Sequence, residues 1–223
     1  MRTKEAFLSC LLCLSVTAGD AAAAILNPGN IVPLFGTTAA ARPELAGVVL
    51  EDTLRPFVID MGGGLSITGT VQDRVVRSDI DGTLDFYYQI ANDATSDGSI
   101  LFANRTDYSG MTTDVDWRID GLGIAAPTFA FRQPSGNEVA FFFTSLPIGP
   151  GADSRFFFID TDATDYNEGG QGLLAGVGSN GHGASVMFST FQPVVVPLPN
   201  ALYMFVAGLM GLMLVKRRGD AAT

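Results

Sequence analysis

The sequence predicts an all-β protein: an antiparallel β-sandwich or jelly-roll-like domain, with an N-terminal signal peptide and a C-terminal transmembrane helix. Three observations predict this fold. Apolar and polar residues alternate with a period of two in several short stretches, turn residues separate these stretches, and helical periodicity is absent outside the termini. The 16 phenylalanines supply apolar area for a core. A β-barrel or a solenoid is the alternative arrangement of the same strands.

The clearest strand covers residues 84–90. Its two faces carry different residues, Leu84, Phe86, Tyr88 and Ile90 on one side and Asp85, Tyr87 and Gln89 on the other. A half-buried strand requires this period of two, so we expect the first face to be buried and the second to meet solvent. Residues 115–119 repeat the pattern and place Asp114 and Asp116 on the solvent side. The turn pairs Asp81-Gly82 and Asp120-Gly121 bound these strands.

The remaining segments divide the chain into four parts. Further strands are predicted at residues 48–50, 56–61, 65–76, 129–131, 139–143, 155–159 and 186–191, with a possible bulge at 72–74 and turns at 62–64 and 147–151. Residues 25–45 contain several prolines and no periodicity, and we assign them to an N-terminal arm. The predicted parts are therefore a signal peptide (1–24), this arm, a sandwich ectodomain (46–192) and a C-terminal segment (193–223).

The N-terminus has the features of a secretory signal peptide. Arg2 and Lys4 precede an apolar stretch at residues 6–18, and the alanines at 21–24 suit signal peptidase cleavage. Both cysteines, Cys10 and Cys13, lie in this segment. The exported chain is therefore expected to lack disulfides, thiol nucleophiles and cysteine metal ligands.

The C-terminus combines a proline-containing stretch, a short apolar helix and a basic cluster. The stretch is Val196, Pro197, Leu198, Pro199 and Asn200. Residues 201–215 follow without a charge and would form a helix of about 22 Å, which spans a bilayer only if the bilayer thins around it. Lys216, Arg217 and Arg218 then provide a positive-inside stop signal, which predicts an external N-terminal domain. An ordinary tail anchor is the alternative interpretation.

The charge balance narrows the possible partners. Residues 25–199 hold 8 arginines and 20 acidic residues, a formal charge of −12. Such an acidic surface disfavours nucleic acid and anionic lipid, and it favours solubility and association with divalent cations.

Candidates for chemistry are few. His182 is the only histidine and lies in a glycine-rich stretch, so we expect neither a catalytic triad nor a zinc site, and no cofactor. Asp160, Asp162 and Asp165 could offer oxygens to calcium, but they lack the spacing of a known calcium loop, and plain turn and capping aspartates are the favoured explanation. Paired carboxylates of a glycoside hydrolase remain open, because the distance that matters is spatial.

The C-terminal segment resembles the sorting tails of PEP-CTERM proteins, specifically the type whose signature is Val-Pro-Leu-Pro-Ala. Four signature residues match, and Asn200 stands in place of the alanine. The resemblance implies that a membrane-embedded exosortase recognises the signature, removes the helix and passes the protein to the cell surface or its exopolysaccharide.

The body is similar to a β-rich ectodomain that occurs with such tails. The likeness rests on residues 69–77, 82–90, 92–93, 112–115 and 158–164. It implies an exported domain and carries over no catalytic residue.

The expected function is therefore a non-enzymatic structural or interaction role at the cell surface or in the exopolysaccharide matrix. A carbohydrate-binding module is the first alternative, and it would present exposed aromatics such as Tyr87, Tyr108 or Tyr166. A secreted hydrolase is the second, and it would need a deep cleft with convergent carboxylates.

Overall fold

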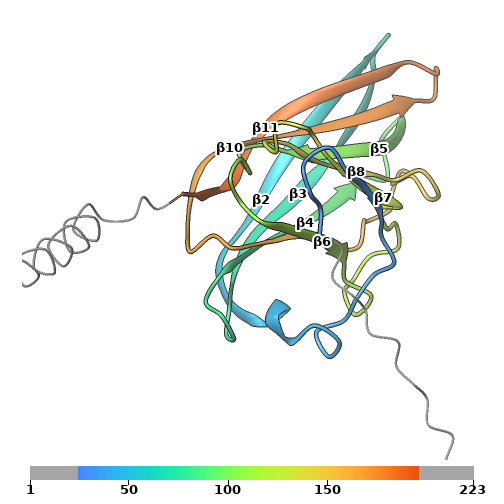
Figure 1. The fold of residues 1–223 in the computed structure, drawn as a ribbon. Coiled ribbons are helices and arrows are strands. Elements are labelled where there is room, and N and C mark those ends of the chain that lie inside the picture. The colour runs from blue at the N-terminus through green and yellow to red at the C-terminus, as the bar shows by residue number, and fades with distance from the viewer. Residues whose placement is uncertain (1–24, 196–223) are drawn as a thin grey trace, which may run out of the picture.

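The structure is a computed structural model that describes residues 25–195, and it confirms the all-β prediction (Figure 1). Two antiparallel sheets pack as a sandwich, and the described residues contain one short 3-10 helix, η1 (Pro43–Leu45). The six-stranded sheet has the order β1 (Ile31–Pro33), β7 (Phe129–Arg132), β8 (Val139–Phe142), β5 (Gly98–Arg105), β10 (Asp165–Gly178) and β11 (Gly183–Val194). The five-stranded sheet has the order β2 (Gly47–Gly62), β3 (Leu65–Ser78), β4 (Leu84–Asn92), β9 (Phe157–Thr161) and β6 (Thr113–Trp117).

Two long hairpins extend beyond the body of the sandwich, where β2–β3 and β10–β11 project in the same direction (Figure 1). The turn of the first is Gly62–Gly64, and all three glycines have positive φ, which side chains with a Cβ rarely adopt. The Asn180 side chain donates to the Met61 carbonyl over 3.1 Å and ties the two tips together.

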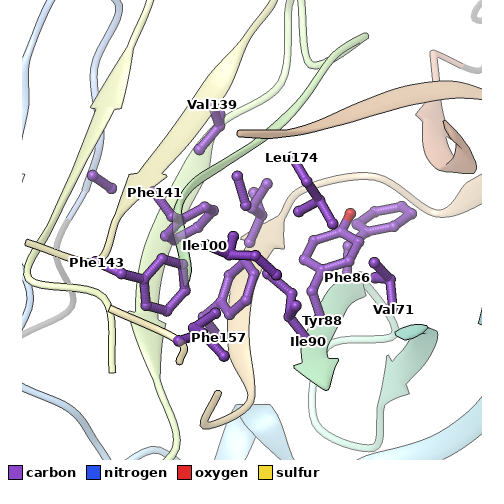
Figure 2. Close-up of a cluster of buried hydrophobic side chains, with 14 of the residues drawn as sticks. Val71, Phe86, Tyr88, Ile90, Ile100, Val139, Phe141, Phe143, Phe157 and Leu174 are labelled. Carbon is purple, nitrogen blue, oxygen red and sulfur yellow. The ribbon is translucent and has the colours of Figure 1, made fainter. Parts of the chain in front are cut away.

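Phenylalanines and branched aliphatic residues from both sheets form the core. Phe86 and Tyr88 of β4 belong to one cluster with Phe141 and Phe143 from the other sheet, and all four are fully buried (Figure 2). Phe157 lies between the layers, with its ring centroid 4.7 Å from that of Phe141. Burial of each such ring contributes roughly 2 to 3 kcal/mol, so the described domain has a substantial apolar core.

The interior also contains two charged residues that the sequence pattern did not assign to it. Asp73 is fully buried and accepts hydrogen bonds from Arg55 (2.9 Å), Thr190 (2.9 Å) and the Phe191 amide (3.1 Å). Arg105 is also fully buried, with its guanidinium 3.9 Å from the centroid of the Tyr88 ring. The polar residues at 72–74 therefore mark a buried charge, and the predicted bulge there is wrong, since the β2–β3 register shifts instead between Val49 and Glu51.

Strand positions agree with the sequence pattern except where glycine or polar residues interrupt it. The pattern did not reveal β5 and β10, and the segments predicted at 48–50 and 56–61 form one continuous strand, β2. Residues 25–45, assigned above to a separate arm, pack within the sandwich. Leu26, Leu34 and Leu45 are buried, and β1 pairs with β7.

Four predicted features lie outside the described residues. They are the signal peptide (1–24), the signature Val196–Asn200, the helix at 201–215 and the basic cluster Lys216–Arg218. Between residues 25 and 195, the structure has no helix with the length and apolarity needed to cross a bilayer.

Candidate binding groove and aspartate row

The outer face of the five-stranded sheet, which points away from the other sheet, gathers most of the polar side chains that could bind or react. Asp85 of β4 pairs in register with Asp160 of β9, which in turn pairs with Asp114 of β6. Since paired residues on neighbouring strands point to the same face, the three carboxyl groups form a row across the sheet. We call Asp85, Asp160 and Asp114 the aspartate row.

Arg42 neutralises this row. Its guanidinium donates to Asp114 over 3.0 Å, to Asp160 over 2.9 Å and to Glu44 over 2.8 Å, and the residue is only 4 % exposed. Arg42 immediately precedes η1, so the contacts hold this segment against the sheet. The row therefore joins the chain before β2 to the centre of the five-stranded sheet.

Burial and mutual proximity change the protonation of the row. Burial raises the pKa of Asp85 well above its usual range, and the neighbouring Asp160 charge raises it further. The pKa of Asp114 rises to about 6, chiefly through burial, although Arg42 opposes the shift. Burial also raises the pKa of Asp160. Asp85 is therefore protonated at neutral pH and can donate a hydrogen bond to Asp160.

A groove of about 570 Å³ lies on the same outer face, next to the row. Val49, Val76 and Leu122 provide apolar surface, while Arg74 and Arg118 provide cations. Its volume falls within the range of small-molecule pockets. We call this hollow the outer groove.

Arginines stacked on aromatic rings shape the outer groove. The Arg74 guanidinium lies 4.8 Å from the centroid of the Phe156 ring and forms an ion pair with Asp52. Arg118 binds Asp120 through two nitrogens, at 2.8 and 3.0 Å. The groove therefore combines apolar surface with fixed donors and acceptors.

Tyr87 separates the groove from the aspartate row. It packs against Phe158 and Leu45, and its hydroxyl donates to the Leu45 carbonyl over 3.1 Å. Burial raises the pKa of Tyr87, so the hydroxyl stays protonated. The prediction that this residue faces solvent is wrong in one respect. It points to the outer side as its register requires, but the η1 segment covers it and leaves it 4 % exposed.

The predicted calcium ligands Asp160, Asp162 and Asp165 each accept hydrogen bonds from groups of the protein. Asp162 accepts hydrogen bonds from the Thr112 amide and hydroxyl, Asp165 binds the Tyr166 amide, and Asp160 binds Arg42. Within residues 25–195, no group of three or more histidine, cysteine, aspartate or glutamate residues has a geometry suited to a metal ion.

The structure also gives the positions of Tyr108, a candidate for stacking on a sugar, and of His182, the histidine considered for catalysis or zinc binding. Tyr108, named above as a candidate exposed aromatic, is fully buried, with its hydroxyl 2.8 Å from that of Tyr88. It is therefore unavailable for stacking on a sugar. His182 lies exposed in the turn between β10 and β11.

Sequence reasoning missed the aspartate row as a unit. It placed Asp85 and Asp114 on the outer face but expected them to be solvated, whereas they are 1 % and 8 % exposed. The signal was present as aspartates at outward positions of three strands. Their convergence depends on β9 inserting between β4 and β6, which the order of the chain does not reveal.

Comparisons with known proteins found no matching family model, no matching curated protein and no matching solved structure.

Proposed function

We propose that this chain is an exported, non-enzymatic protein of the cell surface or exopolysaccharide matrix, delivered by its C-terminal sorting tail. One observation carries the proposal. Within the described residues, Leu26 is already buried in the core, the first strand begins at Ile31, and the last strand ends at Val194, two residues before the predicted signature. The folded domain therefore occupies the residues between the two predicted targeting segments, as expected of an exported protein that carries both.

The outer groove is the proposed contact site for a ligand or matrix partner. It offers Val49, Val76 and Leu122 for apolar contact, and Arg74 and Arg118 with their aspartates for hydrogen bonding. Such a mixture suits a ligand with an apolar side and several hydroxyl groups. Glycan binding in this groove is the second candidate function, and the stacking of Arg74 on Phe156 beside exposed carboxylates favours it.

A non-enzymatic role is proposed because the convergent carboxylates are already occupied. Asp85 is buried beneath its neighbours, and Arg42 holds both Asp114 and Asp160. A glycoside hydrolase needs an acid and a base that reach the substrate from both sides of the scissile bond. The row is instead held within the fold by Arg42, which forms ion pairs with two of its three carboxyl groups.

The decisive experiment measures the intact mass and the cell fraction of the protein from its native host. Loss of residues beyond about Pro199, with recovery at the surface or in the matrix, is the expected result. The Pro197→Ala/Pro199→Ala variant should accumulate unprocessed in the membrane fraction, whereas the Pro147→Ala/Pro150→Ala control, altered in a distant turn, should be processed normally. A full-length C-terminus in the wild-type protein would contradict the proposal.

Binding in the outer groove is tested separately, on the same processed protein. Arg74→Ala and Leu122→Ala should weaken retention on purified exopolysaccharide of the host by about tenfold, and Val58→Ala, at an exposed position that does not line the groove, should not. Equal retention of all variants would exclude the groove as the glycan site.

A further inference from the structure

Two buried charges of opposite sign lie in the interior, one from each sheet. Asp73 belongs to β3 of the five-stranded sheet and Arg105 to β5 of the six-stranded sheet, and both are 0 % exposed. The Arg105 guanidinium covers the ring of Tyr88, which belongs to the apolar cluster of Figure 2. Charges in such surroundings are costly unless they are paired and hydrogen-bonded. We call Arg105 and Asp73 the interior pair.

Rigid neighbours fix the position of the Arg105 guanidinium. It lies over the rings of Tyr88 and Phe188, at 3.9 and 4.7 Å from their centroids. Its Nη1 donates to the Asn104 carbonyl over 2.6 Å. Gly172 lies against the same nitrogen, because a Cβ at that position would be only 2.8 Å from Nη1. The guanidinium is therefore confined by two rings and a stretch of backbone.

The Asp73 carboxylate receives all its hydrogen bonds on one oxygen. Its Oδ2 accepts from Arg55 (2.9 Å), Thr190 (2.9 Å) and the Phe191 amide (3.1 Å). Burial raises the pKa of Asp73, while the Arg105 charge and the hydrogen bonds from Thr190 and Phe191 oppose that shift. The Arg105 charge thus acts on Asp73, although the two side chains, both within the described range, form no direct hydrogen bond or ion pair.

Three polar atoms of the interior pair have no hydrogen-bond partner within residues 25–195. They are Nε and Nη2 of Arg105 and Oδ1 of Asp73. A buried donor or acceptor without a partner loses its hydration and gains nothing in return. Nε and Nη2 lie on one edge of the planar guanidinium and donate in parallel, so both can reach the same acceptor. That acceptor must also donate a hydrogen bond if it is to serve Asp73.

Water has the hydrogen-bonding capacity that these atoms require. It both accepts and donates, so one molecule can accept from the two nitrogens and donate to Oδ1. Buried waters typically make about three hydrogen bonds to polar groups that have no other partner. A chloride or a carboxylate would accept from the guanidinium but would also lie against the Asp73 carboxylate, which is disfavoured because the charges are alike.

We propose that one buried water molecule binds between Arg105 and Asp73 and joins them as a water-bridged ion pair. The bridge ties the two sheets together inside an otherwise apolar core, since each sheet contributes one charge. Fully satisfied polar networks of this kind rigidify a core and specify one arrangement of it. The inference goes beyond the proposed function, because it concerns an internal ligand of the fold and not a surface.

A crystal structure of the purified protein, from crystals grown in sodium bromide, tests the bridge directly. We expect an ordered water within hydrogen-bond distance of Arg105 Nε, Arg105 Nη2 and Asp73 Oδ1, with no anomalous bromide signal at that point. Direct contact between the guanidinium and the carboxylate would overturn the proposal. So would a lack of density between them, or a bromide ion in place of the water.

Magnetic relaxation dispersion of the water oxygen-17 nucleus gives a second test in solution, because it counts long-lived internal waters. Arg105→Met/Asp73→Leu replaces both charges with apolar groups, so neither is left buried and unpaired. This variant should hold one long-lived water fewer than the wild type. An equal count in the two proteins would contradict the proposal.

Arg118→Met/Asp120→Leu is the matched control for this count. Arg118 also lies over a tyrosine ring, 6.0 Å from the Tyr87 centroid, but it binds Asp120 directly over 2.8 and 3.0 Å. Its removal should leave the number of long-lived internal waters unchanged. The same loss in the control as in Arg105→Met/Asp73→Leu would also overturn the assignment of the water to the interior pair.

Discussion

The outer faces of the two sheets differ in what covers and stabilises them. The five-stranded sheet carries buried carboxyl groups that Arg42 neutralises from the segment before β2, so another part of the same chain covers its outer side. The six-stranded sheet carries phenylalanines that pack on one another and are only partly covered. Stability of the first face therefore depends on paired charge, and that of the second depends on apolar packing.

Two adjacent residues on β8 sharpen this comparison and give the largest expected effect. Phe141 points into the core and is fully buried, whereas Phe142 points to the outer face of the six-stranded sheet and is partly exposed. Phe141→Ala should lower the free energy of unfolding by about 3 to 5 kcal/mol, and Phe142→Ala by less than about 2 kcal/mol. Denaturant titration at low protein concentration measures both. Equal losses would mean that Phe142 contributes as much to the core as Phe141.

Removal of Arg42 tests the dependence of the other face on charge. Arg42→Met leaves Asp114 and Asp160 buried without their cation, which should cost about 3 kcal/mol at pH 7. The loss should shrink at pH 4, because protonation removes the unpaired charges. Arg118→Met is the control, since its partner Asp120 is more exposed, and should cost less than about 1 kcal/mol. A pH-independent loss in Arg42→Met would contradict the role of the row.

Asp85 gives a smaller effect with a defined pH dependence. Its pKa is raised in the folded state, so its favourable contribution is complete below the unfolded pKa, near 4, and is lost as pH rises through the folded value. Asp85→Asn keeps a neutral side chain at every pH. The variant should gain on the order of 1 kcal/mol over the wild type between pH 7 and pH 10, as measured by denaturation at each pH. Parallel pH profiles would indicate that Asp85 is ionised in the fold.

The exposed ion pair between Arg74 and Asp52 should matter least. Asp52→Asn removes a charge that is partly solvated, so the free energy of unfolding should change by less than about 0.5 kcal/mol. Thermal and denaturant unfolding should agree on this small value. A loss above 2 kcal/mol would mean that charge on the outer groove stabilises the fold as strongly as the aspartate row.

Sequence reasoning located strands well where one face is apolar. The alternation at residues 84–90 and 115–119 corresponds to β4 and, in part, to β6, and Asp81-Gly82 turns into β4 with positive φ at the glycine. The pattern failed at β5 and β10, in which small and polar residues break the alternation. It also misinterpreted Asp73, because a buried carboxylate with three hydrogen-bond donors looks like part of a bulge when its partners are unknown.

The sequence predicted which side of each strand the residues of the candidate site occupy, but it did not predict their burial. Period-two alternation assigned Asp85, Tyr87 and Asp114 to the outer side of their strands, and that assignment is correct. Their burial was not predictable, since it requires Leu45 and Arg42 to fold across the sheet from a segment without periodicity. The outer groove has the same origin, because it combines segments that are distant in the chain.

By itself, the sequence determined the all-β class, most strand positions and the side of each strand that its residues occupy, because strand geometry is local and repeats every two residues. Only the tertiary structure decided which strands are neighbours. That order places three aspartates in one row, covers them with Arg42, and aligns Phe129, Phe142 and Phe102 on the opposite side of the molecule. The physical reason is that sheet pairing joins residues far apart in the chain, and burial, protonation and surface character follow from those neighbours.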